Sequence, residues 1–491
     1  MTDQPAQETE QQYFGDMPPD EFRKFGHELV DWMASLLENI DEYAVLPDVK
    51  PGAIRRSLPA APPATGEAMQ EILADIDDKI MPGMTHWNHP SFHAYFSITG
   101  SGPGILGELL SAAFNINGML WKSCPAATEL EQVTLDWLRQ MLGLPQDFWG
   151  IIYDTASVSS LHAIAAAREQ LADLNIREQG LAGRQELPRL RLYASQEAHS
   201  SIDKAAITLG LGLAGIRKIP VDEKYRMRPQ ALAEAIAEDR QQGWLPFCVV
   251  ATVGTTSSTS VDPLPSIAEI CQRESLWLHV DAAYGGSAAV VPERRHILDG
   301  CERADSFVVN PHKWLFVPVD LSAFYTRKPH VLKRAFSLVP EYLRTQEDPD
   351  VQNYMDYGVQ LGRRFRALKL WFVLRYFGVE GIVRRIRHHI EMAREFADWV
   401  DAHAEFERMA PTPFSTVCFR AHPKNLHQEV ELQSLNERLI TAINETRKVF
   451  LSHTKLNEKF VLRLAIGNLR TTRAHLNRVK EILDNKLKDL Q

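Results

Sequence analysis

Four residues in the middle of the chain carry side chains suited to covalent or acid–base chemistry, and each follows or ends a short apolar run. They are His199 after "LRLYAS", Thr256 after "FCVVATV", Asp281 in "LWLHVDA" and Lys313 after "SFVVN". A buried lysine needs a partner, and a carboxylate at a strand end must be paired or hydrated. Taken singly, each has an ordinary structural explanation, such as a helix cap, a local ion pair or a hydroxyl-rich turn.

The region that must position these residues runs from about residue 149 to 327. Short β-branched or aromatic segments alternate there with alanine-rich helical segments. This alternation is typical of a largely parallel sheet covered by helices. Ligands of such sheets bind at the carboxyl ends of the strands. The sequence therefore predicts that these side chains serve one site.

A single ligand explains the whole set. Residues 155–157, in "YDTAS", would begin a helix and present backbone N–H groups to a phosphate. Asp281 would keep a pyridine nitrogen protonated, His199 would stack on a flat ring, and Lys313 would form an imine with an aldehyde. These are the requirements of pyridoxal 5′-phosphate, so we predict this cofactor as a Schiff base on Lys313.

Six segments carry a resemblance to a known family. They are "MPGMTHWNHPSFHAYF", "EAHSS", "ATVGTTS", "HVDAAYGG", "NPHKW" and "LGRRFRALKLWFV", in chain order. Together they resemble the pyridoxal-phosphate group II decarboxylases, most closely those that act on aromatic L-amino acids. The resemblance extends over nearly the whole chain, from the helix near residue 20 to "KFVLRLAI".

The resemblance implies an α/β protein of the aspartate-aminotransferase type (PLP fold type I), with a mostly parallel seven-stranded sheet. Residues 1–100 would be a helical and extended arm that packs on a dimer partner. Residues 101–377 would be the large cofactor-binding domain, with a catalytic lid at 336–360, and 378–491 a small C-terminal α/β domain. Such enzymes work as homodimers with active sites at the subunit interface.

The resemblance also implies roles for individual residues. Lys313, Asp281 and His199 would be catalytic, together with Tyr342, which would reach into the neighbouring subunit's site and help to protonate Cα. The further cofactor contacts would be Ala156, Ser157, Thr256, Ala283, Asn310 and His312. The substrate would meet His199 and a wall made of Trp87, Tyr95, Phe96, Ile98, Asn117, Met119 and Gly362.

The implied reaction is decarboxylation of an L-amino acid to its amine and CO2. An aromatic substrate of the tryptophan, phenylalanine, tyrosine or dopa type is favoured, and Gly362 matches the small residue that accompanies bulky substrates. The alternative is an oxygen-using aldehyde synthase, since relatives with Phe at the lid tyrosine or Asn at the stacking histidine divert the reaction. Tyr342 and His199 favour plain decarboxylation, and transamination is a more distant alternative.

The chain departs from its relatives at several positions near the predicted site. Ser97 and Ile98 stand where animal aromatic decarboxylases usually have Pro-Thr, and Asn117 and Met119 stand in place of Ile and Phe. Asp154 and Val158 replace the usual glycine and glutamate around the phosphate turn. The identity of the substrate and some phosphate contacts are therefore open at this point.

The net charge, the lengths of apolar runs and the spacing of the cysteines exclude several classes of function. The net charge is −9 with no long basic run, which argues against nucleic acid or an anionic membrane as partner. No apolar run approaches the ~18 residues of a membrane span. The five cysteines are widely spaced and form no CxxC, which favours reduced thiols and a cytoplasmic location. The predicted partner is a small molecule, the amino acid substrate.

Two other motifs resemble different kinds of binding site, one for a dinucleotide and one for a metal ion. "GPGILG" (102–107) satisfies the dinucleotide-binding pattern, but it contains Pro103 and no βαβ unit surrounds it. His86, His89 and His93 imitate a metal-ligand spacing, but Pro90 breaks any helix between them. The sequence therefore predicts neither a nicotinamide cofactor nor a metal.

Overall fold

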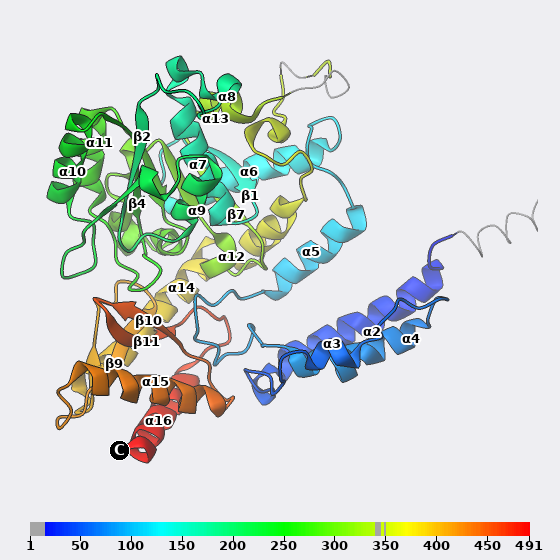
Figure 1. Cartoon of the computed structure of the whole chain (residues 1–491). Helices are drawn as coiled ribbons and strands as arrows, with labels where there is room; N and C mark the ends of the chain where they lie inside the picture. The colour runs from blue at the N-terminus through cyan, green and yellow to red at the C-terminus, as the bar shows by residue number, and fades with distance from the viewer. Residues whose placement is uncertain (1–14, 339–344, 348–349) are drawn as a thin grey trace, which may run out of the picture.

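A seven-stranded sheet forms the centre of the larger part of the molecule, as the computed structural model in Figure 1 shows. The structure describes residues 15–338, 345–347 and 350–491. The strand order is β1-β7-β6-β5-β4-β2-β3, and only the pairs that include β7 are antiparallel. The strands are β1 (Trp149–Tyr153), β2 (Arg189–Ser195), β3 (Ile216–Ile219), β4 (Trp244–Thr252), β5 (Trp277–Asp281), β6 (Ser306–Val309) and β7 (Ser322–Thr326).

The mostly parallel seven-stranded sheet confirms the predicted fold class. The five apolar runs became β1, β2, β4, β5 and β6, because a strand covered on both faces is apolar along its whole length. The sequence pattern did not predict β3 or β7. The "IRKI" of β3 is short and carries two charges, and β7 follows the Lys313 helix after only a short loop.

Helices cover both faces of this sheet, and each layer has its own buried core. One core includes side chains of α6, α10, α11 and the first half of α14, and the other includes those of α7, α9 and α13. The helices of this part are α5 (Gly102–Phe114), α6 (Pro125–Leu142), α7 (Ala156–Glu169), α8 (Ile176–Gln179), α9 (Ser201–Thr208), α10 (Pro229–Gln241), α11 (Leu264–Glu274), α12 (Pro311–Trp314) and α13 (Pro329–Phe336).

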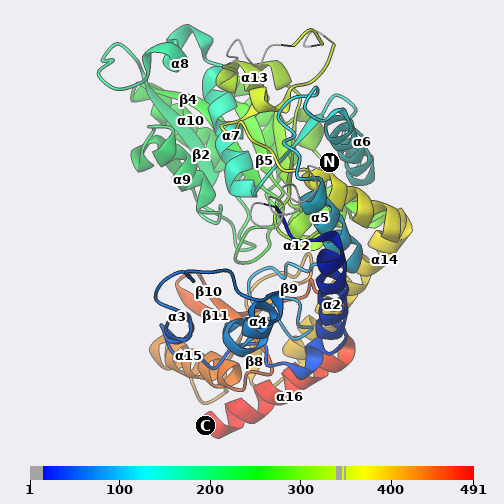
Figure 2. The ribbon, with the colours of Figure 1, turned by 90° about the vertical axis from the view of Figure 1, so that its right-hand side faces the viewer.

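A second, smaller sheet lies below the first in Figures 1 and 2. It is antiparallel in the order β10-β11-β9-β8, and a separate core joins it to its helices. The long helix α14 (Arg366–Ala402) connects the two sheets, and its backbone leaves helical geometry at Gly378. The other elements are β8 (Phe406–Arg408), β9 (Thr416–Ala421), α15 (Glu429–Glu445), β10 (Ser452–Leu456), β11 (Lys459–Ala465) and α16 (Arg473–Leu490).

The N-terminal segment lies along one side of the molecule rather than in either core (Figures 1 and 2). Its helices are α2 (Pro19–Glu38), α3 (Ala53–Ser57) and α4 (Met69–Asp75). The apolar stripe of α2 buries Phe25 but leaves Phe22 67% exposed. On α5, which follows this segment, Leu106, Leu109 and Phe114 are each about half exposed. These two helices therefore present apolar surface that the single chain does not cover.

The segment predicted to be a lid is only partly loop-like. Its second half forms the short 3-10 helix η10 (Tyr354–Tyr357), and all four of its side chains are buried. The Tyr153 hydroxyl donates to the Tyr357 carbonyl, and the Trp121 N–H donates to Asn353 Oδ1 at 3.0 Å. Residues 353–357 are thus anchored to β1 and to the turn before α6, which differs from the polar segment that the sequence predicts.

Candidate active site

The carboxyl ends of three adjacent parallel strands bring the predicted chemistry together. In the ladder Thr252 pairs with Asp281, which in turn pairs with Val308, so β4, β5 and β6 end at the same level. Asp281 is the last residue of β5, and the turn after β4 carries Thr256, which is exposed. The Asp281 side chain is 5% exposed, and its Oδ1 accepts a hydrogen bond from the Ala283 N–H at 3.1 Å.

Lys313 lies on the single-turn helix α12, which follows β6. The Asn310 N–H donates to the Ala283 carbonyl at 3.0 Å, and the Lys313 N–H donates to the Asn310 carbonyl at 2.9 Å, which fixes this turn against the end of β5. The Lys313 Nζ is 5.0 Å from the centre of the Phe96 ring. Burial lowers the pKa of Lys313, the Asp281 carboxylate opposes this shift, and the Arg463 guanidinium adds to it. A lysine with a lowered pKa is more often the neutral, nucleophilic amine.

His199 lies just beyond β2, close enough for the charges of Asp281 and Lys313 to act on its ring. Its Nδ1 accepts the Ser201 N–H at 3.1 Å, so the neutral ring carries its proton on Nε2. Burial lowers the pKa of His199, while the Asp281 carboxylate raises it and the Lys313 ammonium lowers it. The charges of Asp281 and Lys313 both act on the His199 ring, so the three side chains lie at one site, with His199 on its exposed side.

The expected phosphate cradle has donors without partners. Ala156 and Ser157 are the first residues of α7, so the helix itself leaves their N–H groups unbonded. Across from them, one end of the Asn310 amide lies 3.3 Å from His312 Nε2, and its other end is buried without a hydrogen-bond partner. Unpaired buried polar groups are rare. Their presence here fits an anionic group held between α7 and α12.

The protonation of His312 decides which end of that amide is unpaired. His312 Nδ1 accepts the Leu321 N–H at 2.8 Å, and burial lowers the pKa of this histidine to about 3. The neutral ring therefore carries its proton on Nε2, which must face the amide oxygen of Asn310. The amide nitrogen is then the free group, and it is a donor suited to phosphate.

Arg463 was not predicted, yet it lies in this site. It comes from β11 and is 4% exposed; its Nε donates to the Ser257 carbonyl at 3.1 Å, and its Nη1 donates to the Tyr95 carbonyl. Its Nη2 is buried without a partner, and its guanidinium lies 4.4 Å from the centre of the Phe96 ring. The signal for it was a single charge inside the apolar strand "FVLRLAI", since buried arginines are rare without a role.

The predicted substrate residues fall into two groups, and the first accompanies Lys313. Phe96 stacks on Tyr284 at 3.9 Å, directly beside the amine. Trp87 and Tyr95 stack on each other at 5.7 Å, and the Tyr95 ring also meets Phe450 edge-on. Ile98 follows on the same strand-like segment and is half-buried.

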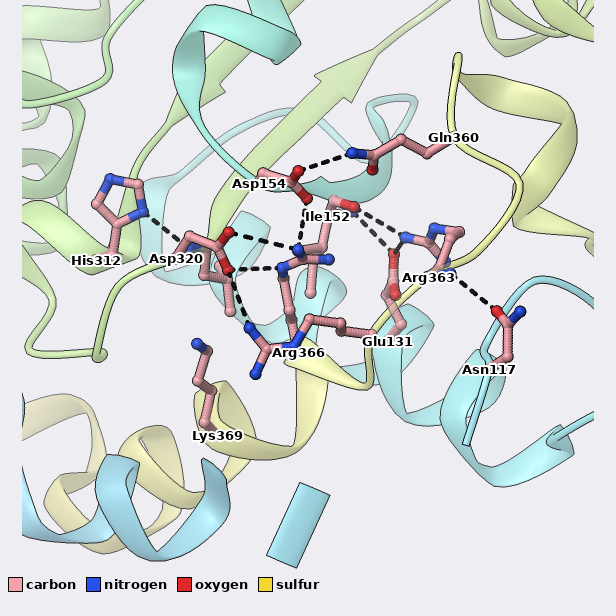
Figure 3. Close-up of polar contacts among 12 residues, drawn as sticks. Asn117, Glu131, Ile152, Asp154, His312, Asp320, Gln360, Arg363, Arg366 and Lys369 are labelled. Carbon is pink, nitrogen blue, oxygen red and sulfur yellow. Dashed lines mark hydrogen bonds and ion pairs between the residues drawn. The ribbon is translucent and has the colours of Figure 1, made fainter. Parts of the chain in front are cut away.

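The second group consists of Asn117, Met119 and Gly362. Asn117 Oδ1 accepts the Arg363 N–H at 2.9 Å, its Nδ2 contacts the Met119 sulfur at 3.5 Å, and a Cβ at Gly362 would lie 3.6 Å from that Nδ2. Figure 3 shows His312 and Asn117 at opposite sides of a polar network. The second group is thus set apart from α12 within this chain. Tyr342 lies outside the described residues.

The rival motifs take structural roles. "GPGILG" is the first part of helix α5, where Gly104 and Gly107 allow close contact with Pro318 and with the Lys369 backbone. His89 and His93 are buried, and among the described residues no group of three or more His, Cys, Asp or Glu side chains could hold a metal ion. Within the same residues, no helix combines the length and apolar character that crossing a bilayer requires.

Comparisons with known proteins agree with this geometry. Residues 51–422 match the family model described as the pyridoxal-dependent decarboxylase conserved domain. The chain is 40% identical to tyrosine decarboxylase 4 of Petroselinum crispum, over 96% of this chain and 94% of that protein. It is 39% identical to phenylacetaldehyde synthase of Arabidopsis thaliana, over 96% of each. The solved structure of Oryza sativa TDC with PLP and tryptamine superimposes with a TM-score of 0.93 at 37% identity, covering 97% of this chain and 99% of that one.

Proposed function

Because the chain belongs to the pyridoxal-dependent decarboxylase family, we propose that it converts an aromatic L-amino acid to the corresponding amine and CO2. The observation that carries the proposal is the meeting of Asp281, His199 and Lys313 at the carboxyl ends of adjacent strands. The aromatic preference is supported by the Phe96–Tyr284 stack beside the lysine and by relatives named for tyrosine and tryptophan.

Pyridoxal phosphate, when bound, supplies an aldehyde for the substrate's amino group and a protonated ring that draws electrons from the Cα–carboxylate bond. Asp281 would keep the proton on the ring nitrogen, and Lys313 would offer the amine that holds the aldehyde between turnovers. His199 would lie against the ring. Ala156, Ser157 and Asn310 would bind the phosphate with the free donors described above, while Ala283, Thr256 and His312 would line the cofactor's surroundings.

Arg463 would orient the substrate's carboxylate. Its Nη2 is the unpaired end of a buried guanidinium beside Phe96, and a carboxylate is the natural partner of such a group. Its other two nitrogens are held by backbone carbonyls, so the guanidinium cannot turn away. The bond that breaks would thus be held in one direction while the side chain packs against Phe96.

We propose Tyr342 as the group that protonates Cα after CO2 has left. Its segment would close over the site and exclude water. The aldehyde synthase is the second candidate, because relatives of similar identity carry that name. The tyrosine in the lid and His199 at the stacking position favour the amine.

We further propose that the active unit is a homodimer. The exposed apolar surfaces of α2 and α5 need a cover, and a second copy of the chain would supply it. The separation of the two substrate groups supports the same arrangement, since Asn117, Met119 and Gly362 of one subunit would complete the wall of the partner's site. The five free thiols suit a reducing, cytoplasmic location.

The product test is a panel of L-amino acids assayed in parallel for CO2, amine, aldehyde and hydrogen peroxide. The proposal expects amine and CO2 in equal amounts from one or more aromatic amino acids, without peroxide. Equal yields of aldehyde and peroxide would instead establish the synthase. In Tyr342→Phe, products should shift from amine towards aldehyde, and unchanged products would remove Tyr342 from its role.

The dimer test mixes two variants that should each fail to form the amine. Lys313→Ala lacks the amine, and Tyr342→Ala lacks the group offered to the neighbouring site. If sites are shared, half of the randomly reassorted dimers contain one intact site, and the mixture recovers about a quarter of the wild-type activity. A mixture that stays inactive after exchange of subunits, verified by differently tagged chains, would contradict shared sites.

A further inference from the structure

Arg366, the first residue of α14, joins two carboxylates that lie on different segments of the large domain. Its Nη2 is 2.6 Å from Asp154 Oδ1, and its Nε donates to Asp320 Oδ1 at 2.9 Å. The guanidinium is only 9% exposed. Although burial pushes the pKa of Asp320 up, the hydrogen bond and charge of Arg366 hold it below its ordinary value. Figure 3 shows the arginine between the two acids.

Each carboxylate leads directly to one half of the phosphate cradle. Asp154 is two residues before Ala156, so its ion pair fixes the turn that opens α7. Asp320 is followed by Leu321, whose N–H donates to His312 Nδ1, and His312 Nε2 faces the Asn310 amide. One guanidinium therefore lies behind both the α7 donors and the Asn310 donor.

Asp154 also receives a contact from the end of the predicted lid. Gln360 Nε2 donates to Asp154 Oδ2 at 2.8 Å, while Arg366 takes the other oxygen. Two residues beyond Gln360 lies Gly362, of the second substrate group. The same carboxylate thus ties the base of the lid to the turn that begins α7.

The Asp154 carboxylate is one of two acids that hold Arg366 in place. The buried guanidinium has an acid on each side, at Asp154 and Asp320, and Arg364 Nη1 lies 4.0 Å from the second acid. A buried cation shared between two acids is held more firmly than one with a single partner.

We propose that Arg366 is a positioning residue that holds the two halves of the phosphate cradle at a fixed separation, and that Asp154 is the acid through which it acts on the α7 half. The inference rests on the cofactor of the proposed function, but not on the substrate or the product. Loss of the Asp154–Arg366 pair loosens the donors before phosphate binds, so the cost falls on cofactor affinity rather than on the chemical step.

The test measures the Kd of the apoenzyme for pyridoxal phosphate by titration, followed by absorbance and by protein fluorescence. The variants are Asp154→Gly, which removes the carboxylate, Asp154→Glu, which keeps the charge, Arg366→Lys, and the double variant with Asp154→Gly. Glu293→Gln is the matched control, since it breaks an exposed bidentate pair with Arg387 far from the cradle.

We expect Asp154→Gly and Arg366→Lys each to raise the Kd about tenfold or more, because each removes or displaces one member of a largely buried ion pair. The double variant should be no weaker than the worse single variant, because both break one pair. Asp154→Glu should recover most of the affinity, and Glu293→Gln should not change it. At saturating cofactor, kcat should stay within about threefold of wild type.

An unchanged Kd in Asp154→Gly would overturn the proposal, and so would strictly additive effects in the double variant. Thermal unfolding of each apoenzyme is measured in parallel, and if Arg366→Lys does not fold, the two Asp154 variants decide the question. A wild-type enzyme that binds the cofactor but releases no CO2 would refute the proposed function while leaving this measurement intact.

Discussion

The Lys313 group and the Asn117–Gly362 group differ in how completely one chain builds them. Asp281 and Lys313 are packed into the end of the large sheet, His199 lies on the exposed side of the same site, and each has a defined neighbour. Asn117 and Gly362 lie on exposed turns and contact mainly each other and Arg363. The first group carries the side chains that any reaction on this cofactor needs, and the second carries residues that the chain leaves at its surface.

This difference separates the residues that determine the reaction from the residues that determine the choice of substrate. The buried group determines which bond is broken, and its residues leave little room for exchange without loss of the reaction. The exposed group is a wall that can change shape at small cost, because its contacts are few and involve short side chains. Substitutions in the first should therefore affect every substrate equally, and substitutions in the second should change the ratio between substrates.

The largest effect is expected for Lys313→Ala. Without the amine, kcat/KM should fall by at least about 10³-fold for every amino acid tested. Borohydride reduction followed by peptide mapping should label Lys313 in the wild type and no lysine in the variant. Lys224→Ala, an exposed lysine, is the control. If the label appeared on another residue of the wild type, the assignment of Lys313 as the imine-forming lysine would be wrong.

Arg463→Gln should follow, because glutamine can still donate to the Ser257 carbonyl but offers no charge to a carboxylate. We expect kcat/KM to fall about 100-fold, mainly through KM, and by a similar factor for tryptophan, tyrosine and phenylalanine. Initial rates over a range of substrate concentrations provide the check. A strong dependence of the loss on the aromatic side chain would place Arg463 with the selective wall instead.

His93 supports the segment that presents Phe96 to Lys313, and it makes that support sensitive to acid. Burial lowers the pKa of His93 from 6.5 to about 4, so the unfolded chain binds a proton more readily than the folded one. The free energy of unfolding should therefore fall as the pH drops below 6.5, by about 2 kcal/mol at pH 5 from this residue alone. Urea unfolding of wild type and His93→Gln at pH 7 and pH 5 measures this. An equally large pH effect in the variant would contradict it.

The smallest effect is expected for Gly362→Ser. A Cβ at this position meets nothing closer than the Asn117 amide at 3.6 Å, so the fold should tolerate the change. The added hydroxymethyl group should lower kcat/KM for tryptophan relative to that for smaller substrates by about tenfold. Competition between two amino acids in one reaction measures the ratio directly. An equal loss of kcat/KM for all substrates would contradict the assignment of Gly362 to substrate selection.

The sequence identified the buried group because its members follow strands closely along the chain. Lys313 comes four residues after β6, Asp281 ends β5, and the parallel order of these strands made their meeting foreseeable. The fold class followed from the same alternation of strands and helices. Local pattern was enough, since a parallel sheet places all such strand ends at one edge.

Arg463 and Arg366 could not be found in this way. Arg463 is far from Phe96 in sequence, and Arg366 is 212 positions after Asp154, so their roles arise only from packing between distant segments. The burial of η10 has a related cause, because its two tyrosines pack against side chains of β1 and α13 that are distant in the sequence. Long-range contacts of this kind leave no local signature.

Gly378 interrupts α14, the helix between the two sheets, and glycine is required there by its backbone conformation rather than by a lack of room for a side chain. Its φ of 63° and ψ of 170° interrupt α14, and a Cβ built on it would meet no atom within 4 Å. Backbone of this kind is almost confined to glycine, because an L side chain clashes with its own main chain there. A D-amino acid at this joint would be accommodated, whereas any L-residue would strain it. The interruption in α14, the helix that connects the two sheets, therefore depends on the absence of an L side chain at a single residue.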